Sequence, residues 1–409
     1  MLYRLTVLFA LASVAAGVPA ADETPSVIAA RVAEASEAGR FAEAAELAAD
    51  LSRLLPHSIQ AKIILARALA RDGQANHALR QLGEVVDYGV RFDPDDPAWN
   101  EFRAGSEFQA LVKEMESRTA PLLRSEPAFL LEKDLIPESV AYDARSGAFY
   151  VGSMYKAKIV RIDRGGEVSD FVSSGRDGLL SVLGMKIDPV RRELWAVSGN
   201  FVDRPPLQRR DPATEGKGQI FRFDLDSSDL LRSYPAKQWS AEAPLWFNDL
   251  VLSPDGTAYI TAGPDGIYRL RRDDEHPEPY LKIENAFFNG ITISPDGTTL
   301  FAASHVEGVI RRIDLETKEH STMDVPRAVT LGGIDGLYFH DDSLVGIQNG
   351  VDPARVVRAW LDPEWRHVVR FTVLEQLHPL SDLPLTGVIV GSDLYYVARS
   401  QLRAFDEGT

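Results

Sequence analysis

The sequence predicts a mainly β fold, a six-bladed β-propeller, preceded by an α-helical region. Short apolar segments separated by turn residues recur from about residue 128 to residue 409, whereas residues from about 25 to 120 show helical periodicity. Six repeats of roughly 40–50 residues are typical of a propeller, in which each repeat forms one blade. The repeats begin at Glu138, Gly184, Asn248, Asn289, Asp335 and Thr386.

Residues 1–20 have the pattern of a secretory signal peptide. Arg4 supplies a positive charge, residues 7–18 form an apolar run too short to span a bilayer, and Val18-Pro19-Ala20 offers small residues for cleavage. An uncleaved anchor is the alternative. We therefore expect a periplasmic or secreted protein that has no stable membrane insertion after cleavage.

Composition excludes several classes of protein. The 409 residues include 44 Lys and Arg against 60 Asp and Glu, a net charge of −16, which argues against a nucleic-acid or anionic-membrane surface. The chain has no Cys, so disulfides, zinc–thiolate sites and thiol catalysis are excluded. High acidity alone is most simply a solubility feature.

The helical region, residues 25–120, begins with an apolar face that runs from Phe41 to Leu51 at helical spacing. Further helices are expected at about residues 60–71, 75–86 and 107–118. Gly39 and Gly73 lie 34 residues apart, and this period resembles the tetratricopeptide repeat. Only about two repeats fit, so we expect them to dock on the propeller or on a protein partner.

Turn chemistry marks the hairpins of the second region, residues 128–409. Ser-Pro-Asp-Gly occurs at residues 253–256 and 294–297, where Pro favours the turn and Gly accepts a positive φ. A long gap between two repeats predicts an inserted loop at about residues 199–218, and residues 129–131 are expected to supply a closing outer strand. Second strands of the blades are expected at residues 148–152, 193–197, 258–262, 300–303, 343–347 and 393–398.

Four residues that open inner strands carry oxygen-bearing side chains: Glu138, Asn248, Asn289 and Asp335. Inner strands of a propeller surround an axial channel, so these residues could meet near its mouth. Carboxylates and amide carbonyls are the ligands that Ca²⁺ prefers, and the absence of thiolates and of His at these positions disfavours zinc. The alternative is that each residue only caps a turn.

Two histidines, His305 and His340, are weaker candidates for acid–base work at a rim. A hydrogen-bonded or exposed loop histidine is the simpler interpretation of each. The chain has no Gly-x-Ser-x-Gly segment and no phosphate-binding glycine-rich loop, so a serine hydrolase and a nucleotide site lack their signatures.

Residues from about 128 to 409 resemble the senescence marker protein / gluconolactonase family of six-bladed propellers. The resemblance rests on residues 137–143, Asn248-Asp249, Asn289-Gly290 and residues 333–337. It implies a divalent cation held by one Glu, two Asn and one Asp. It also implies hydrolysis of lactones or related esters. The family usually has Gly where this chain has Ser139. The implied metal ligands are Glu138, Asn248, Asn289 and Asp335, with Asp335 also handling the proton of the attacking water.

These observations predict an exported hydrolase that acts on a small lactone or ester through a divalent cation, most simply Ca²⁺. The alternative is a non-catalytic protein that binds a protein partner through its helical region, with at most a structural metal. The substrate itself is not specified by any residue pattern.

Overall fold

The computed structural model describes residues 24–199, 218–234, 246–263, 266–283 and 286–402. The predicted signal peptide and nearly all of the predicted insertion lie outside the described residues. No helix in the described part of the chain combines the length and the apolar character that crossing a membrane requires.

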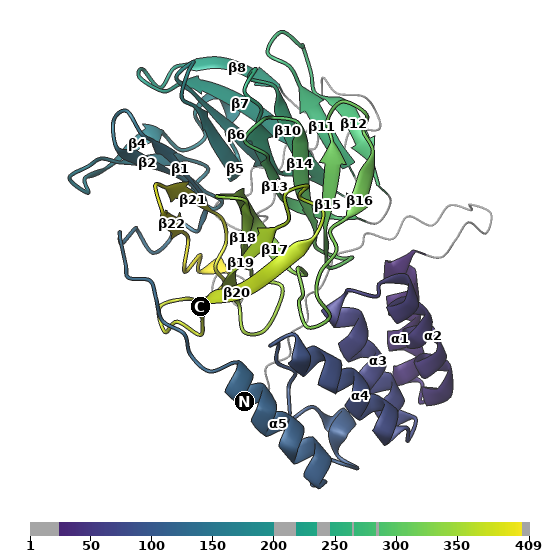
Figure 1. The fold of residues 1–409 in the computed structure, drawn as a ribbon. Coiled ribbons are helices and arrows are strands. Elements are labelled where there is room, and N and C mark those ends of the chain that lie inside the picture. The colour runs from purple at the N-terminus through teal and green to yellow at the C-terminus, as the bar shows by residue number, and fades with distance from the viewer. Residues whose placement is uncertain (1–23, 200–217, 235–245, 264–265, 284–285, 403–409) are drawn as a thin grey trace.

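The described part of the helical region consists of two antiparallel helix pairs followed by a further helix (Figure 1). Gly39 and Gly73 end the turns within the pairs at φ values of 71° and 75°, which glycine adopts without strain. The second pair starts 34 residues after the first, the spacing that the sequence predicts. The elements are α1 (Pro25–Glu37), α2 (Phe41–Leu54), α3 (Ile59–Arg71), α4 (Ala75–Asp87), η1 (Pro97–Trp99) and α5 (Ser106–Arg118).

Five four-stranded antiparallel sheets form blades around a common axis, and a two-stranded sheet lies beside the first blade. Each blade runs in chain order from its innermost strand outward, which is the propeller arrangement that the sequence predicts. The innermost strands are β1 (Pro137–Asp143), β5 (Ser181–Asp188), β9 (Trp246–Leu252), β13 (Phe288–Ile293), β17 (Ile334–Phe339) and, in the two-stranded sheet, β21 (Gly387–Val390).

The remaining strands complete the blades and become more exposed toward the outside. Second strands are buried in all five full blades, as expected for strands covered on both faces. The strands outside the innermost ones are β2 (Ala148–Ser153), β3 (Ile159–Ile162), β4 (Val168–Val172), β6 (Glu193–Gly199), β7 (Gln219–Asp224), β8 (Leu230–Tyr234), β10 (Ala258–Gly263), β11 (Gly266–Leu270), β12 (Glu278–Lys282), β14 (Thr299–Ser304), β15 (Val309–Asp314), β16 (His320–Thr322), β18 (Ser343–Gln348), β19 (Arg355–Leu361), β20 (Val368–Gln376) and β22 (Asp393–Tyr396).

The sixth repeat differs from the prediction of a full blade. In the described residues it contains only β21 and β22, which pack next to β1 and so close the ring. Residues 129–131 do not supply the expected outer strand. Phe129 instead packs at a tilt against Phe149, which also contacts Tyr395, with ring centroids 5.2 and 4.7 Å apart. Aromatic packing replaces ladder hydrogen bonds here.

Antiparallel pairing gives the ring two distinct ends. The first residues of the inner strands and the turns between second and third strands share one end, which we call the head end. Turns between first and second strands lie at the other end, the tail end. Both Ser-Pro-Asp-Gly segments form tail-end hairpins, with φ values of 88° at Gly256 and 73° at Gly297.

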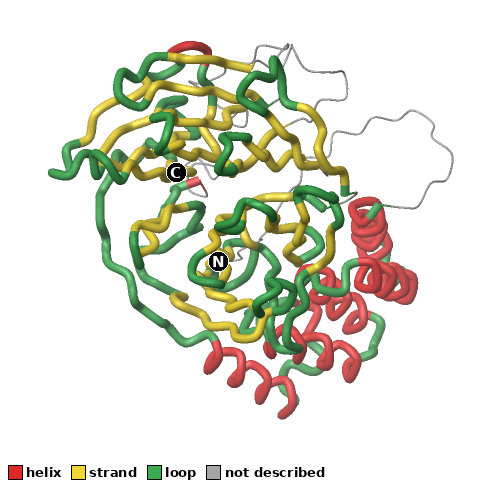
Figure 2. Tube along the Cα trace, turned by 45° about the horizontal axis from the view of Figure 1, so that its top comes forward, coloured by secondary structure: helices red, strands yellow, loops and turns green. Residues whose placement is uncertain are grey.

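The helical region lies against the propeller (Figure 2). Its contacts come from one end of the helix pairs and are made with loops at the head end. Two propeller loops enter its apolar surface: Val306, between β14 and β15, and Val351, between β18 and β19. Val306 contacts the cluster Ile28, Leu51, Leu55 and Ala61, and Val351 belongs to the cluster Ile59, Ile63, Val85 and Val90.

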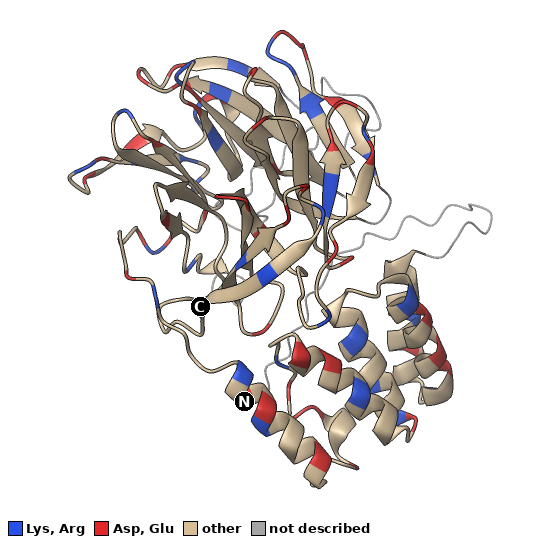
Figure 3. Cartoon of the chain, viewed as in Figure 1, with Lys and Arg blue, Asp and Glu red and all other residues tan. Residues whose placement is uncertain are grey.

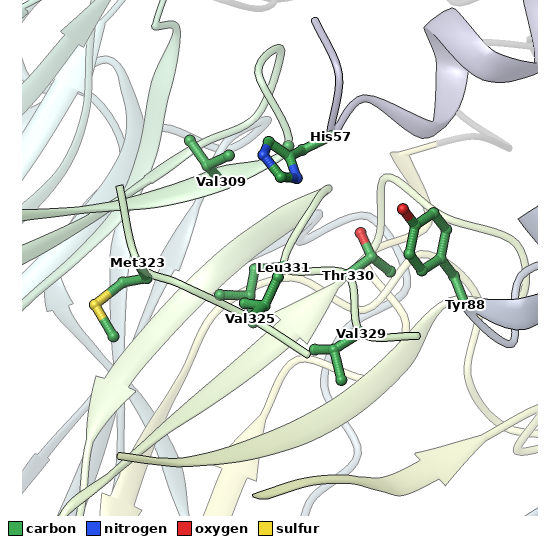
Figure 4. Close-up of a pocket in the computed structure, with 9 residues that line it drawn as sticks. His57, Tyr88, Val309, Met323, Val325, Val329, Thr330 and Leu331 are labelled. Carbon is green, nitrogen blue, oxygen red and sulfur yellow. The ribbon is translucent and has the colours of Figure 1, made fainter. Parts of the chain in front are cut away.

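A small cavity of about 10 Å³ remains at this junction, which is room for about one water molecule. In Figure 4, His57 and Tyr88 of the helical region face apolar propeller side chains around it. The propeller side of the cavity is formed by Gly308, Val309, Met323, Val325, Val329, Thr330 and Leu331.

Charged residues of both signs alternate along the blades and the helices rather than forming a basic face in the view of Figure 3. One tail-end ion pair joins two blades: Arg192 Nη1 lies 2.7 Å from Asp143 Oδ1. Burial opposes ionisation of Asp143, but hydrogen bonds from Arg192 and Ser146 outweigh it and lower the pKa of Asp143 to about 2.

Arg192→Met is expected to lower the free energy of unfolding by up to about 2 kcal/mol at pH 7, the equivalent of the full pKa shift of Asp143, to which Arg192 contributes together with Ser146. A lowered folded-state pKa stabilises the protein above the unfolded value of 3.8, and this contribution disappears as pH falls toward about 2. Urea unfolding at pH 7 and pH 3 measures the difference in unfolding free energy between wild type and Arg192→Met. This difference should be smaller at pH 3.

The exposed pair Arg53–Asp50, 2.7 Å apart on α2, provides the control for Arg192→Met. Arg53→Met should change stability by less than about 0.5 kcal/mol at either pH, because exposed ion pairs contribute little. Equal effects of the two substitutions would show that the inter-blade pair is not a stabilising contact.

Candidate active site

An irregularity in the strand ladder occurs at the same place in all five full blades. The pairing of the inner strand with its neighbour shifts at Glu138, between Val182 and Met185, between Phe247 and Leu250, between Phe288 and Ile291, and between Ile334 and Leu337. A bulge leaves a residue out of the ladder and redirects its side chain. All four predicted ligands therefore lie in bulges at the head end.

Glycines in three bulges let neighbouring inner strands touch. A Cβ on Gly184 would lie 2.6 Å from the Cα of Asp249 and 3.0 Å from the carbonyl oxygen of Asn248. A Cβ on Gly290 would lie 2.2 Å from the carbonyl oxygen of Asp335. A Cβ on Gly336 would lie 3.2 Å from the Cα of Thr386 of the sixth repeat. This contact between bulges brings residues from different blades to one place at the axis.

The structure brings Glu138, Asn289 and Asp335 together. Glu138 and Asp335 are both buried, with exposed fractions of 7% and 4%. Asn289 hydrogen-bonds to Asp335 through its side chain, and its own Oδ1 is buried without a hydrogen-bond partner. Asn248 lies in the neighbouring bulge with a half-buried side chain, and its carbonyl contributes to the contact with Gly184.

Sequence reasoning missed a third buried carboxylate, Asp249, which is 2% exposed. Its Oδ1 accepts a hydrogen bond from Leu250 N at 2.8 Å and lies 3.3 Å from Nζ of Lys186 on β5. The Asn248-Asp249 pair was a visible signal, since both residues open the same strand. Only the bulge shows that both residues belong to the site, because in a regular strand the side chains of Asn248 and Asp249 would face opposite sides of the sheet.

Two further partners of the site were not visible in the sequence pattern. Asn349, just after β18, donates through Nδ2 to Asp335 Oδ2 at 2.5 Å. Tyr338 on β17 is buried, and its hydroxyl accepts a hydrogen bond from Gly387 N at 2.5 Å. Burial, Asp249 and Asp335 raise the pKa of Tyr338, so the phenol stays protonated beside the carboxylates.

The buried carboxylates of this site repel one another. Burial raises the pKa of Glu138, and the charges of Asp335 and Asp249 raise it further. Burial and Asp249 also raise the pKa of Asp335, against hydrogen bonds from Asn349 and Asn289 that lower it. Two carboxyl groups with such shifts either share a proton or require a cation between them.

The donor set fits a hard divalent cation. Two buried carboxylates, an unpartnered amide oxygen and a second amide supply the oxygen ligands that Ca²⁺ takes. No group of three or more His, Asp or Glu side chains among the described residues is arranged to hold a metal by itself. Any cation here would therefore depend on the asparagines as well as the carboxylates.

The two candidate histidines lie at opposite ends of the propeller. His305 is at the head end, where its side chain is partly buried and packs against Gly350, and burial lowers the pKa of its imidazole. His340 is in the tail-end turn between β17 and β18, with Nε2 3.1 Å from Asp341 Oδ2. His340 is thus at the opposite end of the ring from the carboxylates.

Comparison with known proteins gives similarity of structure only, since neither a family model nor a curated protein matches the chain. Virginiamycin B lyase from Staphylococcus aureus is 16% identical with a TM-score of 0.47, over 66% of this chain and 80% of that one. The gluconolactonase XC5397 from Xanthomonas campestris is 13% identical with a TM-score of 0.47, over 68% and 94%. A chain of the nidogen/laminin complex is 14% identical with a TM-score of 0.46, over 63% and 88%. At this level of similarity no activity is transferred to this chain.

Gly290→Ala is expected to lower the melting temperature by several degrees, because its Cβ would collide with the backbone of Asp335. Gly83→Ala in α4 is the matched control, since nothing lies within 4 Å of its Cβ position. Alanine in a helix interior should stabilise the protein by roughly 0.5–1 kcal/mol. Thermal unfolding gives the melting temperature of both variants. A change of the same sign in both would contradict the close contact between Gly290 and Asp335.

Proposed function

We propose that this protein is a metal-dependent hydrolase of lactones or related esters, with its active site at the head end of the channel. The observation that supports this most directly is the meeting of Glu138, Asn289 and Asp335 in bulges, with two raised carboxyl pKa values and an unpartnered amide oxygen. Perturbed carboxylates converging at a channel mouth are characteristic of catalytic sites.

In this proposal Glu138, Asn248, Asn289 and Asp335 hold the cation, most simply Ca²⁺. When bound, a divalent cation supplies a Lewis acid that polarises the ester carbonyl and stabilises the developing negative charge. Asp335 accepts the proton of the attacking water, and Asn349 orients its carboxylate through the hydrogen bond to Oδ2. Lys186 compensates the charge of Asp249, which leaves Asp249 outside the proposed set of ligands.

Export follows from the predicted signal peptide and stays a proposal, as does a protein partner for the helical region. The described helices dock end-on, so the sides of α1 and α2 are not covered by the propeller clusters. The non-catalytic alternative predicts no turnover, with at most a structural cation.

Asp335→Asn is expected to reduce hydrolysis of aldonolactones or aryl esters by at least about 100-fold, because it removes the proton acceptor. Calcium affinity measured by isothermal titration should fall as well, since a charged ligand is lost. The control is Asp341→Asn, an exposed tail-end carboxylate, which should leave both quantities unchanged. Undiminished hydrolysis by Asp335→Asn would rule out this mechanism.

Removal of divalent cations by a chelator should abolish hydrolysis and lower the melting temperature, and added Ca²⁺ should restore both. The expected stabilisation is about 2.7 kcal/mol when Ca²⁺ is at 100 times its dissociation constant. Restored stability without any turnover would favour the non-catalytic alternative. No effect of the chelator on either quantity would show that the four residues act only in the turns.

A further inference from the structure

The loop between β18 and β19, residues 349–354, connects the candidate site with the helical region. At its first residue, Asn349 Nδ2 donates to Asp335 Oδ2 at 2.5 Å. Two residues later, Val351 belongs to the apolar cluster formed with α3 and α4. The carbonyl of Asp352 then accepts a hydrogen bond from Arg91 N at 2.5 Å. One short loop therefore contacts the reacting carboxylate and the helices at the same time.

Arg355, the first residue of β19, fixes this loop to the C-terminal end of α4. Its side chain is buried, and Nη1 donates to the carbonyl oxygens of Tyr88 at 3.1 Å and Gly89 at 2.9 Å. The carbonyls at the end of a helix lack partners within the helix and carry partial negative charge, so a guanidinium is well suited to bind them. The helical region and the propeller thus meet at a charged hydrogen-bonded contact.

A second path leads from Arg355 to the backbone that precedes Asp335. Nε of Arg355 donates to Gln348 Oε1 at 2.7 Å, and Gln348 Nε2 donates to the carbonyl oxygens of Thr330 and Gly332 at 3.1 and 2.7 Å. Gly350 N also donates to the carbonyl of Gly333 at 3.0 Å. These contacts hold the segment that enters β17 in register with the loop.

Close packing makes this connection stiff. A Cβ on Gly333 would lie 2.7 Å from the backbone of Gly350, and a Cβ on Gly350 would lie 2.6 Å from Nε2 of His305. The loop that carries His305 continues to Val306 and Gly308, which also contact the helical region. Because these backbone contacts are so close, a displacement of the helices is transmitted through the two loops to the segment before Asp335.

We propose that the helical region is a positioning element of the active site, which acts through Arg355 and Asn349 to set the orientation of Asp335. The inference rests on the proposed function for the role of Asp335, whereas the physical connection itself does not. Arg355 and Asn349 are positioning residues in this scheme. It also gives the helical region a function that requires no external partner.

The test compares Arg355→Met, Asn349→Ala and the double variant with Arg192→Met as control. Arg192 also joins two elements through its guanidinium, but its partner is the buried carboxylate of Asp143 and it lies at the tail end. Calcium titration measures cation affinity, lactone and aryl ester hydrolysis measures turnover, and hydrogen–deuterium exchange of residues 330–354 measures the connection without any metal or substrate.

Asn349→Ala should weaken calcium binding by about 10–100-fold, the usual effect of removing a hydrogen bond to a metal ligand. Arg355→Met should weaken it in the same direction and speed exchange in residues 330–354. The double variant should be no weaker than Asn349→Ala alone, because both substitutions break one connection. Arg355→Lys should restore part of the affinity, and Arg192→Met should lower stability without changing calcium affinity.

The outcomes separate the two proposals. Unchanged exchange and unchanged calcium affinity in Arg355→Met would overturn the positioning role, whether or not the protein hydrolyses esters. Faster exchange in Arg355→Met would retain the physical connection. If the wild-type protein nevertheless bound no calcium and hydrolysed no lactone or ester, the proposed function would be rejected. If Arg355→Met does not fold, Ile63→Ala on α3 perturbs the same junction from the helical side and is expected to give the same exchange pattern.

Discussion

The close approach of the inner strands around the propeller axis is the constraint on which the rest of this structure depends. Each full blade has a bulge near the start of its inner strand, and glycines at 184, 290 and 336 allow neighbouring bulges to touch. Without that approach the carboxylates of separate blades would stay on separate sheets. The bulges also turn polar side chains toward the axis, where a regular strand would alternate between two faces.

The surroundings of each buried carboxylate determine whether its pKa is raised or lowered in this protein. Asp143 and Asp335 are both buried, yet the pKa of Asp143 is lowered and that of Asp335 is raised. Arg192 compensates Asp143 at the tail end, whereas Asp335 has amide donors and faces other carboxylates at the head end. Compensated carboxylates stabilise the blades, and the uncompensated pair is the place at which we propose a bound cation.

The position of the helical region connects architecture with the candidate site. It docks at the head end, where the β14–β15 and β18–β19 loops contact both the helices and the surroundings of Asp335. A helical layer at the tail end would contact only hairpin turns remote from the carboxylates. The same apolar clusters that attach the helices therefore also restrain the backbone beside the site.

The sequence by itself determined the features that depend on local chemistry. Turn residues, repeat spacing and helical periodicity predicted the propeller, the helical pairs and the residues Glu138, Asn289 and Asp335 at the starts of inner strands. Only the tertiary structure decided the two-stranded sixth sheet, the buried Asp249, the contact of Asn349 with Asp335 and the end at which the helices dock. These depend on strand register and on packing between residues far apart in the chain, and no local pattern encodes such contacts.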